Sequence, residues 1–276
     1  MAGKERKKSR NKGTGLFLAA LLLLFAAMIV SSSVKIVRSR QEQAQGAAAY
    51  ASLAQSVVLQ QEVSASGEEY GGVPEELPEE ESGKSEVSRP PVVDFDALQA
   101  INPQAVGWIR SDTGDINYPV VQGTDNDYYL THLVDGTYNS NGSIFVDFRN
   151  AADISDRNTF IYGHNMRNGA MFASLSLYSA AGYLEMHPEL VLITREESFS
   201  LQVFAGCVVP GNSDLYQMTY RDDEEFASYV EKVKLLSDFS SDVQVGPQDR
   251  IVTLSTCSYD YDDARYLLFC KAVSLR

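Results

Sequence analysis

An uncharged, mostly apolar stretch near the N-terminus constrains this chain more than any other feature. Residues 15–34 carry no charged side chain, and a helix of about twenty residues spans the ~30 Å hydrocarbon core of a bilayer. A basic cluster at residues 4–12 precedes the stretch, which predicts a cytoplasmic N-terminus. A cleaved signal peptide is the alternative, but the apolar run exceeds the usual ~7–15 residues and no clear small-residue cleavage site follows it. We therefore predict a cytoplasmic basic tail over 1–13 and a single-pass transmembrane anchor over 14–34.

The rest of the chain is strongly acidic. The chain has 23 Lys and Arg, 37 Asp and Glu and a formal net charge of −14, yet its first 40 residues hold nine of the bases and one acid, Glu5. A protein body of that sign repels phosphate, so we exclude nucleic acid as a partner. The hydrophobic fraction of 44% is ordinary for a globular protein, which excludes a chain that is disordered throughout.

Residues 35–91 have the composition of an extracytoplasmic stalk or linker. Residues 41–61 are rich in Gln and Ala, and they either extend the helix outward or form a stalk. From 66 to 91 the chain is mainly Glu, Pro, Gly and Ser, with eight Glu against Lys84 and Arg89. Sparse apolar surface and self-repelling charge predict a solvated spacer without chemistry of its own.

Apolar patterning resumes at residue 92 and continues to residue 276, which is enough chain for one folded domain. Most of the signal is β, in short apolar runs separated by Gly, Asn, Asp and Pro turns. The expected strands cover 116–122, 143–147, 159–162, 190–194, 199–209, 251–256 and 266–273. The expected helices cover 94–101, 171–178 and 222–236, with Asp94 or Asp96 as the first cap. Many short strands with few helices predict a mainly β fold, as a closed or partly closed barrel.

Three residues at expected strand ends form the candidate catalytic site. Cys257 ends one strand, Arg265 opens the next, and a hairpin-like return would place them side by side, while His164 follows the strand 159–162. A thiol with an ordinary pKa near ~8.5 must become a thiolate to attack a carbonyl, and an adjacent imidazolium can stabilise it and protonate a leaving amine. Arg is always charged, so it can hold an oxyanion but cannot be a base. Spacing alone leaves open that the Cys and the His are structural.

The motifs around these residues resemble those of the sortase family, class B. The residues that carry the resemblance are Thr253-Leu-Ser-Thr-Cys257, Arg265 and Asn158-Thr-Phe-Ile-Tyr-Gly-His-Asn-Met166, together with 118–122, 125–130 and 142–146. The resemblance covers roughly residues 92–276, and it implies a closed β-barrel of about eight strands. It also implies an N-terminal helix and a longer helix inserted before the strand that carries the nucleophile.

The resemblance implies a membrane-anchored cysteine transpeptidase that acts as a thiol protease on a sorting signal. Its clients would be secreted proteins with a C-terminal signal of the L-P-x-T-G or N-P-x-T-N kind, cleaved after Thr. Cys257 would form a thioacyl enzyme, His164 would be general acid and then base, and Arg265 would hold the substrate backbone and the oxyanion. The acceptor would be an amine of the peptidoglycan cross-bridge or of its lipid-linked precursor. The implied location is the cell membrane of a Gram-positive-type envelope, with the catalytic domain outside the cytoplasm.

Three alternatives stay open. A pilin-polymerising sortase would keep the chemistry and use a pilin lysine as acceptor. An enzyme that only hydrolyses would use water. A catalytically inactive, anchored binding domain belongs to a different functional class, and the intact set of Cys257, His164 and Arg265 argues against it.

The resemblance also implies residues that contact the substrate. Asn126 and Leu130 match positions that line the groove of class B enzymes, and Ser255, two residues before the nucleophile, matches another. Ser213, Gln217 and Met218 align loosely with the loop that reads the signal. Gln217 departs from the aromatic or branched residues that the family often has there, which leaves the preferred signal open. Plain loop or core roles remain the alternative for all six.

The remaining polar candidates favour structural roles. His132 and His187 are expected to be structural, and three histidines without a Cys–His cluster at ligand spacing predict no metal site and no cofactor. The acidic residues after the nucleophile, at 260, 262 and 263, are expected to form a solvated loop. Cys207 and Cys270 lie in apolar runs and are expected to be buried thiols, with a disulfide between them left open.

Overall fold

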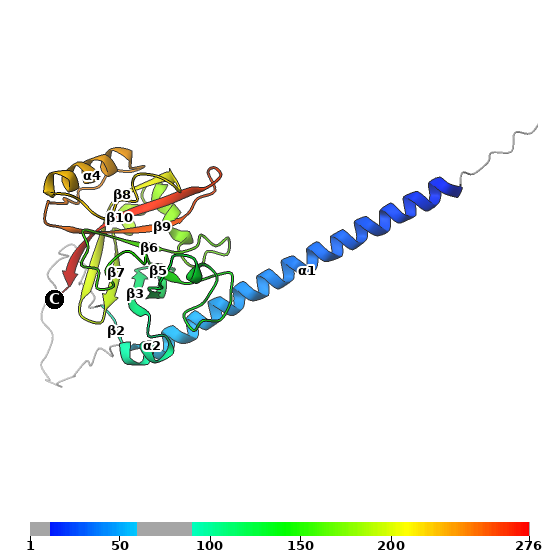
Figure 1. Cartoon of the computed structure of the whole chain (residues 1–276), viewed down its shortest axis with the longest axis horizontal. Coiled ribbons are helices and arrows are strands. Elements are labelled where there is room, and N and C mark those ends of the chain that lie inside the picture. The colour runs from blue at the N-terminus through cyan, green and yellow to red at the C-terminus, as the bar shows by residue number, and fades with distance from the viewer. Residues whose placement is uncertain (1–11, 60–89, 276) are drawn as a thin grey trace, which may run out of the picture. The chain divides into compact units, whose positions relative to one another are not determined.

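The computed structural model describes residues 12–59 and 90–275, in two compact units, 1–45 and 46–276. Most of the predicted basic tail and of the acidic linker lies outside the described residues. Within them, the helix α1 (Lys12–Val57) contains the predicted anchor (Figure 1). It is the one described helix that is long and apolar enough to cross a membrane, and its 18-residue apolar window has a mean hydropathy of 2.3.

A closed eight-stranded barrel forms the body of the second unit, in the order β10-β8-β7-β3-β4-β5-β6-β9 (Figure 1). The expected mainly β fold, with a closed barrel of about eight strands, is confirmed. Two of its contacts, β4–β5 and β6–β9, are parallel and the rest are antiparallel. The strands are β3 (Ala105–Ser111), β4 (Asn117–Val121), β5 (Ile144–Val146), β6 (Asn158–Tyr162), β7 (Glu189–Thr194), β8 (Ser198–Pro210), β9 (Arg250–Cys257) and β10 (Ala264–Leu275).

The strand β3 was not expected from the sequence. It pairs with β4 on one side and with β7 on the other, and its side chains are buried or half-buried at every position. A strand covered on both faces lacks the alternation of apolar and polar residues that makes a strand visible in a sequence. Trp108, on this strand, is fully buried and its Nε1 donates to Asn117 Oδ1 at 2.8 Å.

Helices pack against different parts of the barrel, α2 on β3 and α4 on β8. α2 (Phe95–Ile101) begins after Asp94, whose carboxylate accepts from the Ala97 amide, and α4 (Asp223–Leu236) begins after Asp222 in the same way. The apolar face of α4 packs on β8 and completes a second apolar cluster (Phe226, Tyr229, Val230 and Val233). The helix expected over 171–178 is a 3₁₀ helix, η2 (Ala173–Ser179), and the other short elements are η1 (Tyr128–Leu130) and α3 (Tyr183–Met186).

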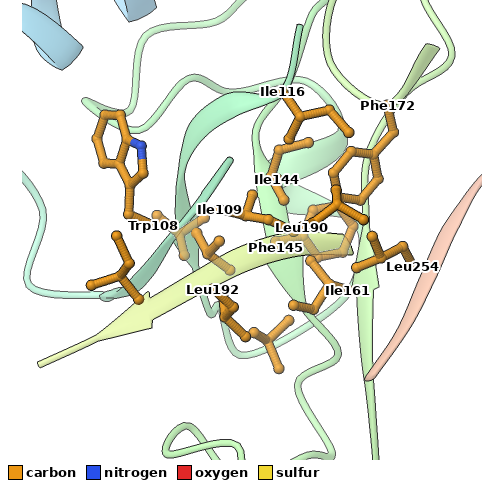
Figure 2. Close-up of a cluster of buried hydrophobic side chains, with 14 of the residues drawn as sticks. Trp108, Ile109, Ile116, Ile144, Phe145, Ile161, Phe172, Leu190, Leu192 and Leu254 are labelled. Atoms are coloured by element: carbon orange, nitrogen blue, oxygen red, sulfur yellow. The ribbon is translucent and has the colours of Figure 1, made fainter. Parts of the chain in front are cut away.

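The main core is one continuous cluster that joins side chains of the barrel strands to those of α1 and α2. Figure 2 shows Trp108 and Ile109 from β3, Phe145 from β5 and Leu254 from β9 in one cluster of buried side chains. Leu254 precedes the strand end that carries Cys257, so the nucleophile strand is anchored in this core. Burial of each such side chain contributes about 1.5–3 kcal/mol, which gives the strand ends a rigid base.

The last three turns of α1 pack in the same unit as the barrel. Tyr50, Leu53 and Val57 are buried there, and β1 (Val58–Leu59) pairs with β2 (Val92–Val93). The sequence placed residues 35–91 in a stalk or linker and began the domain at 92. Packing instead begins at Gly46, because these side chains recur at helical spacing and cover an apolar face of the barrel.

Both cysteines outside the candidate site are buried and free. Cys207 is paired in register with Leu267, whereas Cys270 lies opposite Val203, so the two are not disulfide-bonded. Burial raises the pKa of each thiol, to about 12 for Cys207. Cys257 is therefore the one cysteine whose surroundings favour the thiolate.

Candidate active site

Cys257 and Arg265 lie side by side at the mouth of the barrel. Cys257 is the last residue of β9, Arg265 is the second residue of β10, and the two are direct partners in the antiparallel ladder. The thiol is half-buried, and the guanidinium side chain is 31% exposed. The hairpin-like return expected from the sequence brings them together as predicted.

His164 reaches the same place from β6. That strand runs parallel to β9, with Tyr162 opposite Ser255, and the Gly163 amide donates to the Ser255 carbonyl at 3.1 Å. The next residue, Asn165, donates its side-chain amide to the Cys257 carbonyl at 2.9 Å. These bonds tie the loop that carries His164 to the end of the nucleophile strand.

The Leu130 carbonyl orients the imidazole. His164 Nε2 lies 2.7 Å from the Leu130 carbonyl oxygen. A carbonyl oxygen only accepts hydrogen bonds, so Nε2 must carry a proton, and Nδ1 is left as the nitrogen that can exchange one. The backbone of residue 130 thus selects the tautomer of the candidate acid–base.

The electrostatics of the pair favour thiolate and imidazolium. The Cys257 thiol raises the pKa of His164; burial opposes this and the Leu130 carbonyl supports it. In turn, His164 lowers the pKa of Cys257 against the effect of burial, with Arg265 acting in the same direction and Asp263 opposing. Each group stabilises the charged form of the other, as nucleophilic attack by a thiol requires.

Asp263 holds the guanidinium in this structure. Its Oδ1 lies 2.9 Å from Arg265 Nη2, and Arg265 Nη1 donates to the Ala264 carbonyl. Asp263 has a φ of 60°, an uncommon backbone conformation for a residue other than glycine. The loop was expected to be merely solvated, whereas one of its carboxylates is part of the site.

A buried carboxylate organises one wall beside the site. Asp147, which follows β5, is fully buried and accepts hydrogen bonds from Asn126 Nδ2 and from the Tyr162 hydroxyl, both at 2.9 Å. Arg149 donates to it twice, at 2.8 and 2.7 Å. Asn126 also accepts from the Phe148 amide, so most of its polar capacity is used inside the protein. Leu130, four residues on, is 37% exposed and is available to a ligand.

The loop between β8 and α4 forms a second wall, next to the first. The Tyr216 hydroxyl oxygen lies 2.9 Å from the hydroxyl oxygen of buried Ser255, and the Tyr216 ring stacks with that of Tyr162. A cavity of about 510 Å³ adjoins this tyrosine, and Gln217, Met218, Arg149 and Asn150 line it with other residues. Ser213 is not among those lining residues. Its hydroxyl accepts a hydrogen bond from the Leu215 amide and stabilises a turn. Of the six expected contacts, Gln217 and Met218 share one cavity, whereas Asn126 and Ser255 are held by internal partners.

Several residues of this site were not found from the sequence: Asp147, Tyr162, Tyr216, Asp263 and the backbone carbonyl of Leu130. An Asp directly after a buried strand was a usable signal for the first. The others depend on which loops meet in space, which spacing along the chain does not reveal.

The remaining histidines lie apart from the thiol. His132 stacks on Tyr128, with ring centroids 4.0 Å apart, and His187 pairs with Asp112 at 2.8 Å. Within residues 12–59 and 90–275, no group of three or more His, Cys, Asp or Glu is arranged to hold a metal ion.

Comparison with known proteins places this geometry in a family. The Sortase domain profile matches residues 109–273. Sortase B of Listeria monocytogenes is 38% identical over 181 residues, which are 64% of this chain and 73% of that protein. Sortase B of Staphylococcus aureus is 32% identical over 183 residues, which are 66% of this chain and 75% of that protein. The structure of a Staphylococcus aureus sortase B–substrate complex superposes with a TM-score of 0.64 at 31% identity, covering 66% of this chain and 86% of that one. The chain therefore belongs to the sortase family of cysteine transpeptidases, and its named relatives are class B sortases.

Proposed function

We propose that this chain is a membrane-anchored sortase that cleaves a C-terminal sorting signal after Thr and transfers the protein to an amine of the cell wall. The observation that carries the proposal is the placement of Cys257 between His164 and Arg265 at the barrel mouth. The family supports the general cell-wall transpeptidase role. The cleavage position, the acceptor and the anchoring are the proposed steps.

In the first half-reaction the Cys257 thiolate attacks the Thr carbonyl carbon. The carbonyl oxygen becomes an oxyanion, and the Arg265 guanidinium stabilises it once its bond to Asp263 is exchanged for the substrate. His164, as imidazolium, gives its Nδ1 proton to the leaving amine as the peptide bond breaks. The products are a thioester on Cys257, a released C-terminal peptide and a neutral His164.

In the second half-reaction the acceptor amine attacks the thioester. Neutral His164 takes the proton that the amine loses, and Cys257 leaves as the thiolate. The enzyme returns to its starting charge state, and the client protein is joined to the acceptor by a new amide bond. The acceptor that we propose is an amine of the peptidoglycan cross-bridge or its lipid-linked precursor.

The sorting signal would be read between the two walls of the site. Leu130 offers an exposed apolar side chain on one wall, and Gln217 and Met218 line the cavity on the other. A signal of the L-P-x-T-G or N-P-x-T-N kind combines an apolar or amide first residue with Pro and Thr. Both chemistries suit walls of this composition.

The apolar part of α1 supports anchoring in the cell membrane. A single span with a basic N-terminal flank would leave the barrel outside the cytoplasm, on the side where the wall and the secreted clients are. Sidedness can be tested by protease treatment of intact cells, which should digest the barrel and spare an N-terminal tag. Protection of the barrel would overturn this topology.

The full chain in detergent micelles, with fluorogenic peptides of both signal kinds, tests the activity. Amine acceptors of the cross-bridge type and a pilin-type lysine peptide are compared, and mass spectrometry identifies the products. We expect cleavage after Thr, an acyl adduct on Cys257 and an amide product with the cross-bridge amine. Preferential transfer to the lysine peptide would point to a pilin-polymerising enzyme, and hydrolysis alone to a peptidase.

Two cysteine variants test the identity of the nucleophile. Cys257→Ala should lose cleavage and transfer together, whereas Cys207→Ala should retain both because its thiol is buried and protonated. Activity that survives in Cys257→Ala would contradict the proposed nucleophile. Absence of any adduct in the wild-type protein, despite an alkylatable Cys257, would favour an inactive binding domain.

A further inference from the structure

The end of α1 contacts the loop 139–143, which in turn contacts the segment that orients the catalytic imidazole. The Tyr50 hydroxyl lies 2.7 Å from the Gly142 carbonyl oxygen and 2.9 Å from Ser143 Oγ, and it has one proton to donate to either of these acceptors. This tyrosine is 3% exposed, and its ring packs edge-on against Tyr118 at a centroid distance of 5.3 Å. A buried hydroxyl with two partners holds this loop in one position.

The helix and the loop are in close contact at a second point. A Cβ atom added to Gly46 would lie 2.6 Å from Asn141 Nδ2 and 2.8 Å from Asn139 Oδ1. Real Cβ atoms do not approach other atoms so closely, so a larger residue at 46 would force the Asn139 and Asn141 side chains to shift. The helix and the loop therefore meet at two points, one helical turn apart, and the hydrogen bonds lie at Tyr50.

The loop then holds residues 129–132 through several bonds. The Ser143 amide donates to the Tyr129 carbonyl at 2.9 Å, and Ser143 Oγ donates to the His132 carbonyl at 2.8 Å. Gly142, with a φ of 59°, lies so close that a Cβ there would be 2.7 Å from the Leu130 carbonyl oxygen. That oxygen accepts from His164 Nε2. The loop therefore packs directly against the acceptor that determines the tautomer of His164.

We propose that the C-terminal end of α1, residues 46–57, is a positioning element of the active site, and that the Tyr50 hydroxyl acts through Gly142 and Ser143 to hold the Leu130 carbonyl against His164. The proposal rests on the role assigned to His164 under the proposed function. Tyr50 touches no reacting group, so it is a positioning residue. It gives the segment between anchor and barrel a function beyond that of a spacer.

Tyr50→Phe in the full-length protein tests the proposal, because it removes the hydroxyl and keeps the ring against Tyr118. We expect kcat to fall about three- to tenfold, as for loss of one positioning hydrogen bond. The matched control is Tyr178→Phe. Tyr178 is also buried, and its hydroxyl donates to the His187 carbonyl at 2.8 Å, away from the thiol. It should lose a similar amount of stability and keep the wild-type kcat.

A second readout does not depend on the sorting signal. Alkylation of Cys257 by iodoacetamide is followed against pH. The charged or titratable groups around this thiol are His164, Arg265, Asp263 and Tyr216. A loosened Leu130 carbonyl favours the imidazolium less, so the Tyr50→Phe midpoint should move to higher pH while Tyr178→Phe keeps the wild-type midpoint. This readout separates failure of the proposal from failure of the proposed activity, because it needs no substrate.

A wild-type kcat and alkylation midpoint in folded Tyr50→Phe would overturn the proposal. Equal losses in Tyr178→Phe would also overturn it, since the effect would then be general destabilisation. If Tyr50→Phe does not fold, the Ser143→Ala variant tests the same proposal. It removes the hydroxyl that links Tyr50 to the His132 carbonyl, and we expect the same direction of change in both readouts.

Discussion

Arg265 lies directly opposite Cys257 in the β9–β10 ladder, and its guanidinium is ion-paired with Asp263, two residues before it, at 2.9 Å. The carboxylate acts on both members of the site. It occupies the guanidinium proposed to stabilise the oxyanion, and it raises the pKa of Cys257 while His164 and Arg265 lower it. A substrate oxyanion would therefore compete with Asp263 for this guanidinium.

The first prediction concerns that carboxylate. Asp263→Asn removes the charge and keeps a residue type that tolerates positive φ. The pH midpoint for alkylation of Cys257 should fall, and kcat/KM should rise by up to about fivefold, the strength of an exposed ion pair. Asp262→Asn, an exposed neighbour with the same charge change, is the control and should leave both unchanged. An unchanged midpoint in Asp263→Asn would mean that the carboxylate does not act on the thiol.

The second prediction concerns His164. His164→Ala removes the group that most lowers the pKa of Cys257. The thiolate should then form at higher pH, so the alkylation midpoint should move up toward the ordinary value of ~8.5. His187→Ala, a histidine paired with Asp112 away from the thiol, should keep the wild-type curve. If both variants alkylate like the wild type, the imidazole does not stabilise the thiolate.

The third prediction concerns where the folded unit begins. A chain starting at residue 46 keeps Tyr50, Leu53 and Val57, whereas one starting at residue 91 loses all three and the strand β1. At about 1.5–3 kcal/mol for each buried side chain, the shorter protein should be less stable by on the order of 5 kcal/mol. Urea unfolding of the two proteins measures this difference. Equal stabilities would show that residues 46–59 do not belong to the folded unit.

The fourth prediction concerns the buried carboxylate of Asp147. Burial alone would raise its pKa, but hydrogen bonds from Arg149, Tyr162 and Asn126 together outweigh burial and hold it below the ordinary value. Its stabilising effect is therefore fully present above the unfolded-state pKa of ~3.9 and is lost as pH falls through the lower folded-state pKa. Asp147→Asn should destabilise the protein by about 1–3 kcal/mol at pH 7, and the difference from wild type should shrink below about pH 4.

The control for this measurement is Asp96→Asn. Asp96 forms an exposed ion pair with Arg195 at 2.9 Å, and its side chain is 89% exposed. Such a pair contributes at most about 1 kcal/mol, so this variant should unfold close to wild type at either pH. A difference between Asp147→Asn and wild type that persists unchanged in acid would argue against a charged Asp147 in the folded state.

The strand-end chemistry was predictable because it is local. Cys257 and Arg265 are separated by one turn between adjacent antiparallel strands, so their spacing along the chain implies their pairing in space. The cap of α2 was readable as one of Asp94 and Asp96, because a capping Asp is a local signal, and Asp94 is the cap. The helix expected from residue 222 begins one residue later, with Asp222 as its cap. By contrast, β3 was missed because burial on both faces removes the periodicity that reveals a strand.

The sequence by itself determined the family, the mainly β barrel, the apolar N-terminal segment and the three candidate catalytic residues, because each depends on a motif or on a pattern within a short stretch. Only the tertiary structure decided which groups act on those residues. The Leu130 carbonyl meets His164 across 34 positions of chain, and Tyr50 meets Ser143 across 93. Contacts of that separation arise from how the barrel closes and where α1 packs on it, and neither is encoded in the spacing of residues along the chain.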